Sequence, residues 1–328
     1  FIYSACDTLT IEKPKFKKFN WVGVSKTRIT ERFLIFEKKS KYSGYSFFDK
    51  KRYFEISKTK KKFDAFIWYQ RALVSEPTDV AVQWNHALSL LANGDLENGW
   101  VAAKCRHFKP EMYIERLGLP PEWDGKAINN GTLFVFQEQG IGDELRFANC
   151  FEDLSKKLKI QCFIETDARL IPLFSRSFPK LSFIKKLERK VDGHVIVNYT
   201  DTIKKFNAAA HCPLGDLPLH FRQSIDHFNF NDAYLVPDEN ERAHWRKILQ
   251  QIGAGLKIGF CWQTALPSKT YDSYFPDLHE LGPIFALKNA TFVNLQYTDC
   301  EQQLQAAEND FNISIFRPTN IDMFNGSI

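Results

Sequence analysis

The sequence lacks several features that would each point to a particular class of protein. Its 328 residues contain no run of about 18 apolar residues, which argues against a membrane-spanning helix. The eight histidines show no HExxH spacing and have no cysteine partners at zinc-finger distances, so we expect no metal site. A P-loop and a GxSxG elbow are also missing. With 44% apolar and 25% charged residues, the composition predicts a soluble globular chain with more than one domain.

The seven cysteines contain no CxxC pair and are odd in number. Several lie in apolar, strand-like runs, where a free cysteine behaves as a small hydrophobic residue. A reducing compartment is therefore expected, and the sequence predicts a cytoplasmic protein.

The charge is distributed unevenly along the chain. The net charge is +5, but residues 1–62 carry +11 and the remainder carries −6. Aromatic residues alternate with the basic ones, so contact with nucleic acid or an anionic surface is one interpretation. The other is a solvated, partly disordered extension. We favour the extension, placed at residues 1–45, because no nucleic-acid motif accompanies the charge.

Residues 46–108 have helical periodicity. Ala65, Tyr69, Ala72 and Pro77 follow one another at offsets of 4, 3 and 5. This spacing resembles the second helix of a tetratricopeptide repeat, in which small residues let two helices approach and proline ends the unit. An ordinary helical hairpin with accidental spacing is the alternative.

A further unit follows, with Ala87 at a small-residue position and a turn at 93–95. One and a half to two repeats cannot bury their own faces, so we expect them to pack on upstream repeats or on the next domain. Residues 109–130, which contain several prolines, are expected to be a connector.

Residues 131–236 change to short apolar strands that alternate with helices, which predicts a parallel sheet covered on both faces and one Rossmann-like half. The expected strands are Thr132–Gln137, Ile160–Glu165, Leu181–Ile184 and His194–Asn198, and the expected helices are Asp143–Leu158 and Ala168–Ser177.

A linking helix is expected within 237–255, and a second strand–helix series fills 256–328. Its strands are expected at Leu256–Trp262, Thr291–Gln296 and Asn312–Phe316, with helices at Asp277–Leu287 and Cys300–Glu308. Three strands are few for a doubly wound domain. We therefore expect this half to be incomplete and the chain to be a fragment.

The loop Gln137–Asp143 lies where a parallel strand passes into a helix, which is where such sheets bind ligands. Gly140 and Gly142 suit a tight turn, but Leu145 replaces the third glycine of a dinucleotide fingerprint, so we expect no nicotinamide site. The carboxylates of Asp143 and Glu144 would repel a diphosphate at the helix N-terminus, and the loop suits a hydroxyl better. Alternatively, Asp143 only caps the helix.

Five sequence blocks in this order resemble tetratricopeptide-repeat proteins that carry a glycosyltransferase domain similar to ADP-heptose:lipopolysaccharide heptosyltransferases. The blocks are PEWDG, EQGIGDELRFANCF, GDLPLHF, IGFCWQT and FVNLQYTDCEQQL, and the resemblance covers residues 63–316. It implies an α/β fold of the GT-B type, in which two Rossmann-like halves face a cleft. The acceptor would bind to the first half and a nucleotide-sugar to the second.

The resemblance also implies roles for individual residues. Asp143 corresponds to the base. Thr264 and Lys269 are the nearest counterparts of the residues that contact the donor phosphates, although an arginine common in relatives is missing after Lys269. The acceptor loop would consist of Gln139, Gly140, Gly142 and Glu144, with Glu138 and Glu144 as other carboxylates near Asp143.

The implied function is sugar transfer from a nucleotide-sugar to an acceptor hydroxyl by inverting single displacement, without a cofactor or metal. Thr264, Lys269 and backbone N–H groups near Gly259–Gln263 would offset charge on the leaving diphosphate. The acceptor would be a glycan, a lipid-linked molecule or a protein. The alternative is a non-catalytic scaffold whose repeats bind a protein partner and whose Rossmann-like part is a relic.

Overall fold

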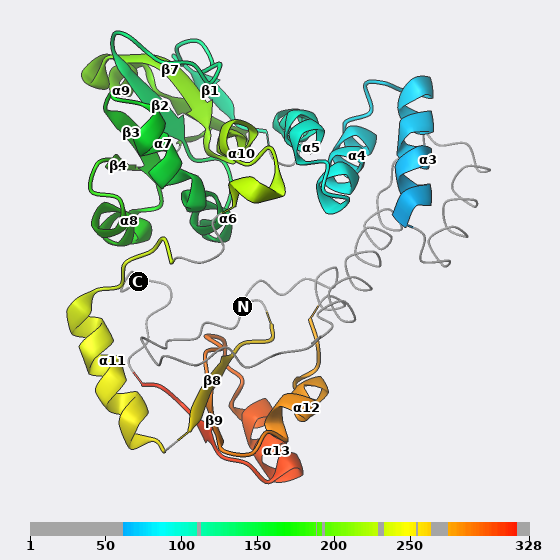
Figure 1. The fold of residues 1–328 in the computed structure, drawn as a ribbon, viewed down its shortest axis with the longest axis vertical. Coiled ribbons are helices and arrows are strands. Elements are labelled where there is room, and N and C mark those ends of the chain that lie inside the picture. Colours follow the sequence, from blue (N-terminus) through cyan, green and yellow to red (C-terminus); the bar gives the residue numbers. More distant parts are fainter. Residues whose placement is uncertain are drawn as a thin grey trace. The chain divides into compact units, whose positions relative to one another are not determined.

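The computed structural model describes residues 62–109, 113–187, 189–191, 194–228, 233–253, 255–263 and 275–319. The chain is mixed α/β with parallel sheets (Figure 1) and divides into two compact units, one containing Glu37–Pro237 and the other Asp238–Ser327. The basic extension and the first part of the expected repeats lie outside the described residues.

The described part of the first unit begins with three consecutive helices. Asp79 caps the second helix, since its carboxylate accepts hydrogen bonds from the Ala81 and Val82 N–H groups at 2.9 and 3.0 Å. Ala87 is fully buried. The helices are α3 (Lys62–Ser75), α4 (Val80–Ala92) and α5 (Leu96–Ala103), and α5 continues into the 3₁₀ helix η1 (Lys104–Phe108). We call Lys62–Phe108 the helical segment.

A four-stranded parallel sheet forms the centre of this unit, in the order β4-β3-β2-β7. The chain moves outward from β2 to β3 and β4 and then returns to the other side of β2 as β7. The pairing places Leu133 beside Cys162 and Val135 beside Cys212. The strands are β2 (Thr132–Phe136), β3 (Cys162–Thr166), β4 (Ser182–Lys185) and β7 (Ala208–Pro213).

Helices cover one face of this sheet. Leu133, Val135 and Ile164 point to this face and are fully buried against Phe151, Leu154 and other helix residues. The expected helix Asp143–Leu158 is interrupted by a 3₁₀ turn at Ala148–Cys150. The helices are α6 (Ile141–Phe147), α7 (Phe151–Lys157), α8 (Ile171–Ser177) and α10 (Leu217–Phe221).

A second, smaller sheet and α9 (Thr200–Phe206) cover the opposite face, where Phe134 packs on Tyr199 with ring centroids 5.1 Å apart. This sheet has the order β1-β6-β5, from β1 (Glu115–Leu117), β6 (His194–Asn198) and β5 (Arg189–Val191). Placing His194–Asn198 in the main sheet was therefore wrong. The residues between β4 and β6 are too few for a parallel crossover, which needs a dozen or more.

The second unit has a three-stranded parallel sheet in the order β10-β9-β8. Its core includes Phe260, Phe285, Phe292 and Leu304. The expected helix Asp277–Leu287 is a 3₁₀ helix, η8 (Leu278–Leu281), followed by the short α12 (Gly282–Phe285). The remaining elements are α11 (Glu239–Gln251), β8 (Leu256–Phe260), β9 (Ala290–Asn294), α13 (Glu301–Phe311) and β10 (Ile315–Phe316).

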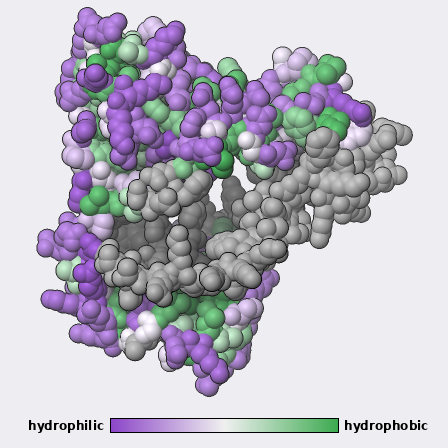
Figure 2. Space-filling view, viewed as in Figure 1, coloured by the Kyte–Doolittle hydropathy of each residue, from purple (hydrophilic) through white to green (hydrophobic). Residues whose placement is uncertain are grey.

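The surface of the helical segment carries exposed apolar side chains. Hydrophobic residues show among the hydrophilic ones in this part of Figure 2, and Val74, Val101 and Phe108 are exposed. No helix in the described ranges is long and apolar enough to cross a membrane.

Candidate functional site

The strand order places a topological switch point between β2 and β7. Connections leave β2 toward β3 on one side, and β7 lies on the other side. Open α/β sheets bind ligands in the crevice outside the carboxyl ends of the strands at such a point. Here Gln137 and Glu138 follow β2, and the 3₁₀ helix η5 (Leu214–Asp216) follows β7.

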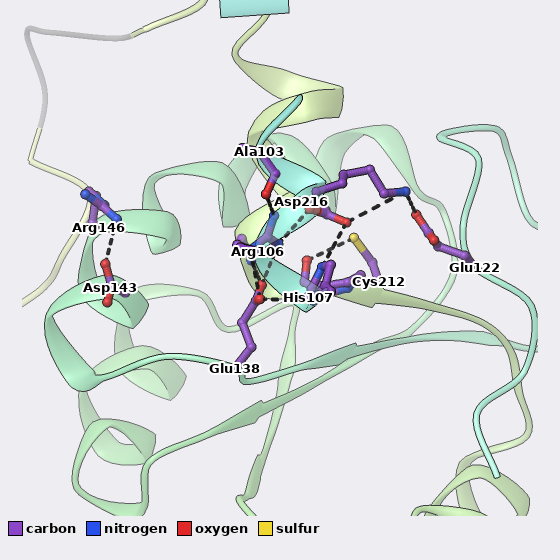
Figure 3. A network of polar contacts seen from close by, with 12 residues as sticks. Ala103, Arg106, His107, Glu122, Glu138, Asp143, Arg146, Cys212 and Asp216 are labelled. Atoms are coloured by element: carbon purple, nitrogen blue, oxygen red, sulfur yellow. Dashed lines mark hydrogen bonds and ion pairs between the residues drawn. The ribbon is translucent and has the colours of Figure 1, made fainter. Parts of the chain in front are cut away.

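A buried arginine joins these two strand ends. Arg106 donates from Nε to Glu138 Oε2 at 2.9 Å and from Nη2 to Glu138 Oε1 at 2.7 Å. Nη2 also donates to Asp216 Oδ1 at 2.7 Å (Figure 3). The Gly215 N–H donates to Glu138 Oε1 at 2.8 Å. These four residues, Arg106, Glu138, Gly215 and Asp216, are called the Arg106 cluster below.

The Arg106 cluster is almost completely buried, and its charges therefore interact strongly. The exposed fractions of the Arg106, Glu138 and Asp216 side chains are 3%, 5% and 2%. Burial by itself raises the pKa of Asp216, but His107 and the Arg106 guanidinium outweigh it and lower the pKa to about 2. Asp216 is therefore ionised at neutral pH.

Two further basic residues of η1 surround the cluster. His107 Nδ1 lies 3.6 Å from Glu138 Oε2, and its Nε2 lies 3.8 Å from Asp216 Oδ2. Lys104 Nζ lies 4.0 Å from Asp216 Oδ2 and forms an ion pair with Glu122. One turn of 3₁₀ helix therefore brings three basic side chains to the carboxyl edge of the sheet.

Glu144 is also buried, although it belongs to the first turn of α6. Its carboxylate accepts hydrogen bonds from the Thr166 hydroxyl and from the Asp167 N–H at 3.0 Å, both at the end of β3. Burial raises the pKa of Glu144 in spite of these hydrogen bonds. The side chain therefore ties α6 to β3.

Asp143 has a different environment from its neighbour. Its carboxylate is about one-third exposed and accepts a hydrogen bond from Arg146 Nη2 at 2.6 Å. Figure 3 shows this pair apart from the Arg106 cluster. The N-cap of α6 is Gly140, and the Asp143 carboxylate makes no capping hydrogen bond, so the interpretation of Asp143 as a helix cap was wrong.

The two loop glycines have backbone conformations that do not require glycine. Gly140 has φ −83° and ψ 170°, an extended conformation open to any residue, and Gly142 has no positive φ. A Cβ at either position would meet no atom within 4 Å, so there is open space beside both glycines.

On the second unit, Thr264 and Lys269 lie outside the described residues. The strand ends nearby are described, and Gln296 Oε1 accepts hydrogen bonds from the Trp262 and Gln263 N–H groups at 3.2 and 3.1 Å. These two N–H groups are already bonded, so they are not free to offset charge on a leaving group. In the described ranges no group of three or more His, Cys, Asp or Glu could hold a metal ion.

The sequence analysis did not identify Arg106, His107 or Asp216 as site residues. Asp216 lies in the GDLPLHF block, which was a signal for it. Arg106 follows a helix in a region with helical periodicity, and nothing local to it indicates that it contacts residues 32 and 110 positions away.

Comparison with known proteins found a sequence similarity to a curated protein. No family model and no solved structure matches it. The chain is 32% identical over 254 residues to Protein FlbA of Caulobacter vibrioides (strain ATCC 19089 / CIP 103742 / CB 15), which covers 75% of this chain and 42% of FlbA. The chain thus spans less than half of that relative, and the relative's name states no activity.

Proposed function

We propose that the chain is a glycosyltransferase-like protein that transfers a sugar from a nucleotide-sugar to an acceptor hydroxyl. The observation that carries this proposal is the carboxyl edge of the main sheet, where the partly exposed carboxylate of Asp143 lies beside a topological switch point. The resemblance of the EQGIGDE block to heptosyltransferases supports the same assignment.

Asp143 is the proposed base because the two other nearby carboxylates, Glu138 and Glu144, are already held by hydrogen bonds. Glu138 is held by Arg106 and by the Gly215 N–H. Glu144 is buried and bonded to Thr166. Asp143 has a partly exposed carboxylate and an exposed partner, Arg146, which can move aside at little cost because surface ion pairs contribute about 0–1 kcal/mol.

The reaction follows from this placement. Asp143 takes the proton of the acceptor hydroxyl as that oxygen forms a bond to the anomeric carbon. The bond between the anomeric carbon and the diphosphate oxygen breaks on the opposite face, and the diphosphate leaves with the electron pair. Thr264 and Lys269 are the proposed donor-phosphate contacts on the second unit. Gln139, Gly140 and Gly142 would lie beside the acceptor, where the glycines leave room.

The helical segment is proposed to consist of tetratricopeptide-type repeats. Gly99 is buried against Leu91 of α4, and Ala87 is a buried small residue of α4, as small residues are in such repeats. A protein acceptor or partner is proposed for this surface, where apolar side chains are exposed.

The proposal is tested with the full-length protein, first by calorimetric titration with a panel of nucleotide-sugars and then by turnover. Asp143→Asn should lower kcat about 100- to 10,000-fold, because an amide cannot accept the proton. Its melting temperature should change little, since the carboxylate makes no capping bond. The matched control is Glu152→Gln, which removes another exposed ion pair, with Lys156 on α7, and should leave kcat unchanged.

An Asp143→Asn protein with wild-type turnover would remove Asp143 as the base. A chain that binds no nucleotide-sugar and transfers no sugar would contradict the enzyme assignment and favour the scaffold alternative.

A further inference from the structure

We propose that Arg106 is a positioning residue that sets the relative placement of the two strand-end loops flanking the acceptor site, so that the helical segment forms part of that site. This inference rests on the proposed function for its kinetic consequence, but its structural consequence can be measured independently. It follows from the contacts, burial and tight packing of the Arg106 cluster.

The first step is the geometry of the guanidinium. Its planar fork bonds to carboxylates that follow two different strands, Glu138 after β2 and Asp216 after β7. A further hydrogen bond, from Nη1 to the Ala103 carbonyl at 3.1 Å, anchors the guanidinium to the end of α5. Because a guanidinium presents donors in a fixed plane, these bonds fix directions as well as distances.

The second step is the close packing around the Arg106 cluster. A Cβ placed on Gly215 would lie 2.7 Å from Glu138 Oε1 and 2.9 Å from Arg106 Nη2. The backbone after β7 is therefore in direct contact with the side chains, and a shift of Glu138 must displace it.

The third step connects the Arg106 cluster to the proposed acceptor loop. Glu138 is followed directly by Gln139 and Gly140, and the Gly140 carbonyl accepts hydrogen bonds from the Asp143 and Glu144 N–H groups at 2.9 and 3.1 Å. The position of Glu138 thus determines where the first turn of α6, and with it Asp143, begins. Arg106 acts on Asp143 through this loop and does not touch the reacting atoms.

Arg222 provides a matched control in the same unit. Its side chain is 5% exposed, close to the 3% of Arg106, and it donates to Asn149 Oδ1 at 2.9 Å and Asp153 Oδ2 at 2.7 Å. It also meets the helical segment, since Trp100 Nε1 donates to the Arg222 carbonyl at 2.9 Å. The Arg222 side chain donates hydrogen bonds to Asn149, Asp153 and Phe221, none of which belongs to the Arg106 cluster, so Arg222→Gln removes a buried arginine without releasing the strand-end loops.

The experiment compares Arg106→Gln, Arg106→Lys and Arg222→Gln in the full-length protein, each at a temperature where it is equally folded. Amide hydrogen exchange at Gly215, Asp143 and Glu144 should become at least about tenfold faster in both Arg106 variants and remain unchanged in Arg222→Gln. Lysine keeps the charge but loses the fork, so Arg106→Lys tests geometry rather than charge. If Arg106→Gln does not fold, Arg106→Lys and the control still decide the question.

Turnover supplies the second readout. The Arg106 variants should lose about 10- to 100-fold in kcat with the KM for the nucleotide-sugar unchanged, because a displacement of about 1 Å costs that much in a positioned reaction. Equal losses of kcat in Arg106→Gln and Arg222→Gln, or wild-type exchange in Arg106→Lys, would overturn the proposal. If the wild-type protein shows no turnover, the proposed function fails, and the exchange data still test the role of Arg106 in holding the loops.

Discussion

At the scale of single residues, the carboxylates of Glu138, Asp143 and Glu144 have different environments because their side chains contact different groups. Glu138 forms a buried ion pair with Arg106, Glu144 is buried among hydrogen-bond donors, and Asp143 is about one-third exposed to solvent. A buried acid must find either a cation or donors, or else it becomes protonated. Acidic residues close together in sequence therefore differ in their availability for proton transfer.

Asp216 should make stability depend on acid pH. Its pKa is about 2 in the folded state, below the ordinary value of 3.8, so its contribution is present above about pH 4 and is lost as the pH falls toward 2. The shift corresponds to about 2 kcal/mol of unfolding free energy. Denaturant unfolding between pH 5 and pH 2 should therefore show a shallower loss in Asp216→Asn than in wild type.

Asp124→Asn is the control for this prediction, because Asp124 also has a lowered pKa but pairs with Lys126 in an exposed position, where solvent screens the interaction. An equal pH dependence in wild type and Asp216→Asn would contradict the assignment of Asp216 as a paired buried acid.

At the scale of secondary-structure elements, close packing decides which residues are tolerated. Gly99 of α5 lies against α4, where a Cβ would come within 2.6 Å of Leu91 Cδ2 and 3.0 Å of the Leu91 backbone nitrogen. Gly142, in the first turn of α6, has open space instead. The two glycines have the same intrinsic helix propensity, so only their surroundings distinguish them.

Gly99→Ala and Gly142→Ala should therefore change stability in opposite directions. Alanine is favoured over glycine within a helix by about 1 kcal/mol, and Gly142→Ala should keep part of this gain. At Gly99 the rigid Leu91 backbone prevents relief of the clash, and overpacking costs about 1–3 kcal/mol, so we expect a net loss.

Thermal and denaturant unfolding of both variants measures this difference. A stabilising Gly99→Ala substitution would show that α4 and α5 can separate freely and would count against their tight packing.

At the scale of the whole molecule, the helical segment and the four-stranded sheet belong to one unit, and the sheet β10-β9-β8 belongs to the other. Two sets of contacts connect the helical segment to the rest of this unit. One is the Arg106 cluster, and the other is the hydrogen bond from Trp100 to Arg222. The helical segment thus packs on the domain that follows it, one of the two arrangements that the sequence left open.

Calorimetry should show two transitions, because the core of each unit is a separate hydrophobic cluster. Leu304→Ala, at a fully buried position of the second core, should lower one transition through a cost of about 2–5 kcal/mol. Leu154→Ala, buried in the first core, should lower the other. A single transition that both substitutions shift equally would contradict this division.

The sequence by itself determined the elements whose signals are local. The apolar run TLFVF became β2, and the alternation of strands and helices predicted parallel sheets, because burial on both faces requires continuous apolar strands. Strand β7 was missed because its segment, AAAHCP, lacks the β-branched residues that mark strands.

Only the tertiary structure decided the composition of the site. The side chain of Arg106 meets Asp216, 110 positions away, because β7 returns to the side of β2 and η1 packs on both strand ends. Which loop carboxylate stays exposed was also decided there, since burial depends on the neighbours that the fold brings together. Local sequence sets backbone preference and apolar pattern, whereas charge pairing across the sheet edge is a long-range contact that no local pattern encodes.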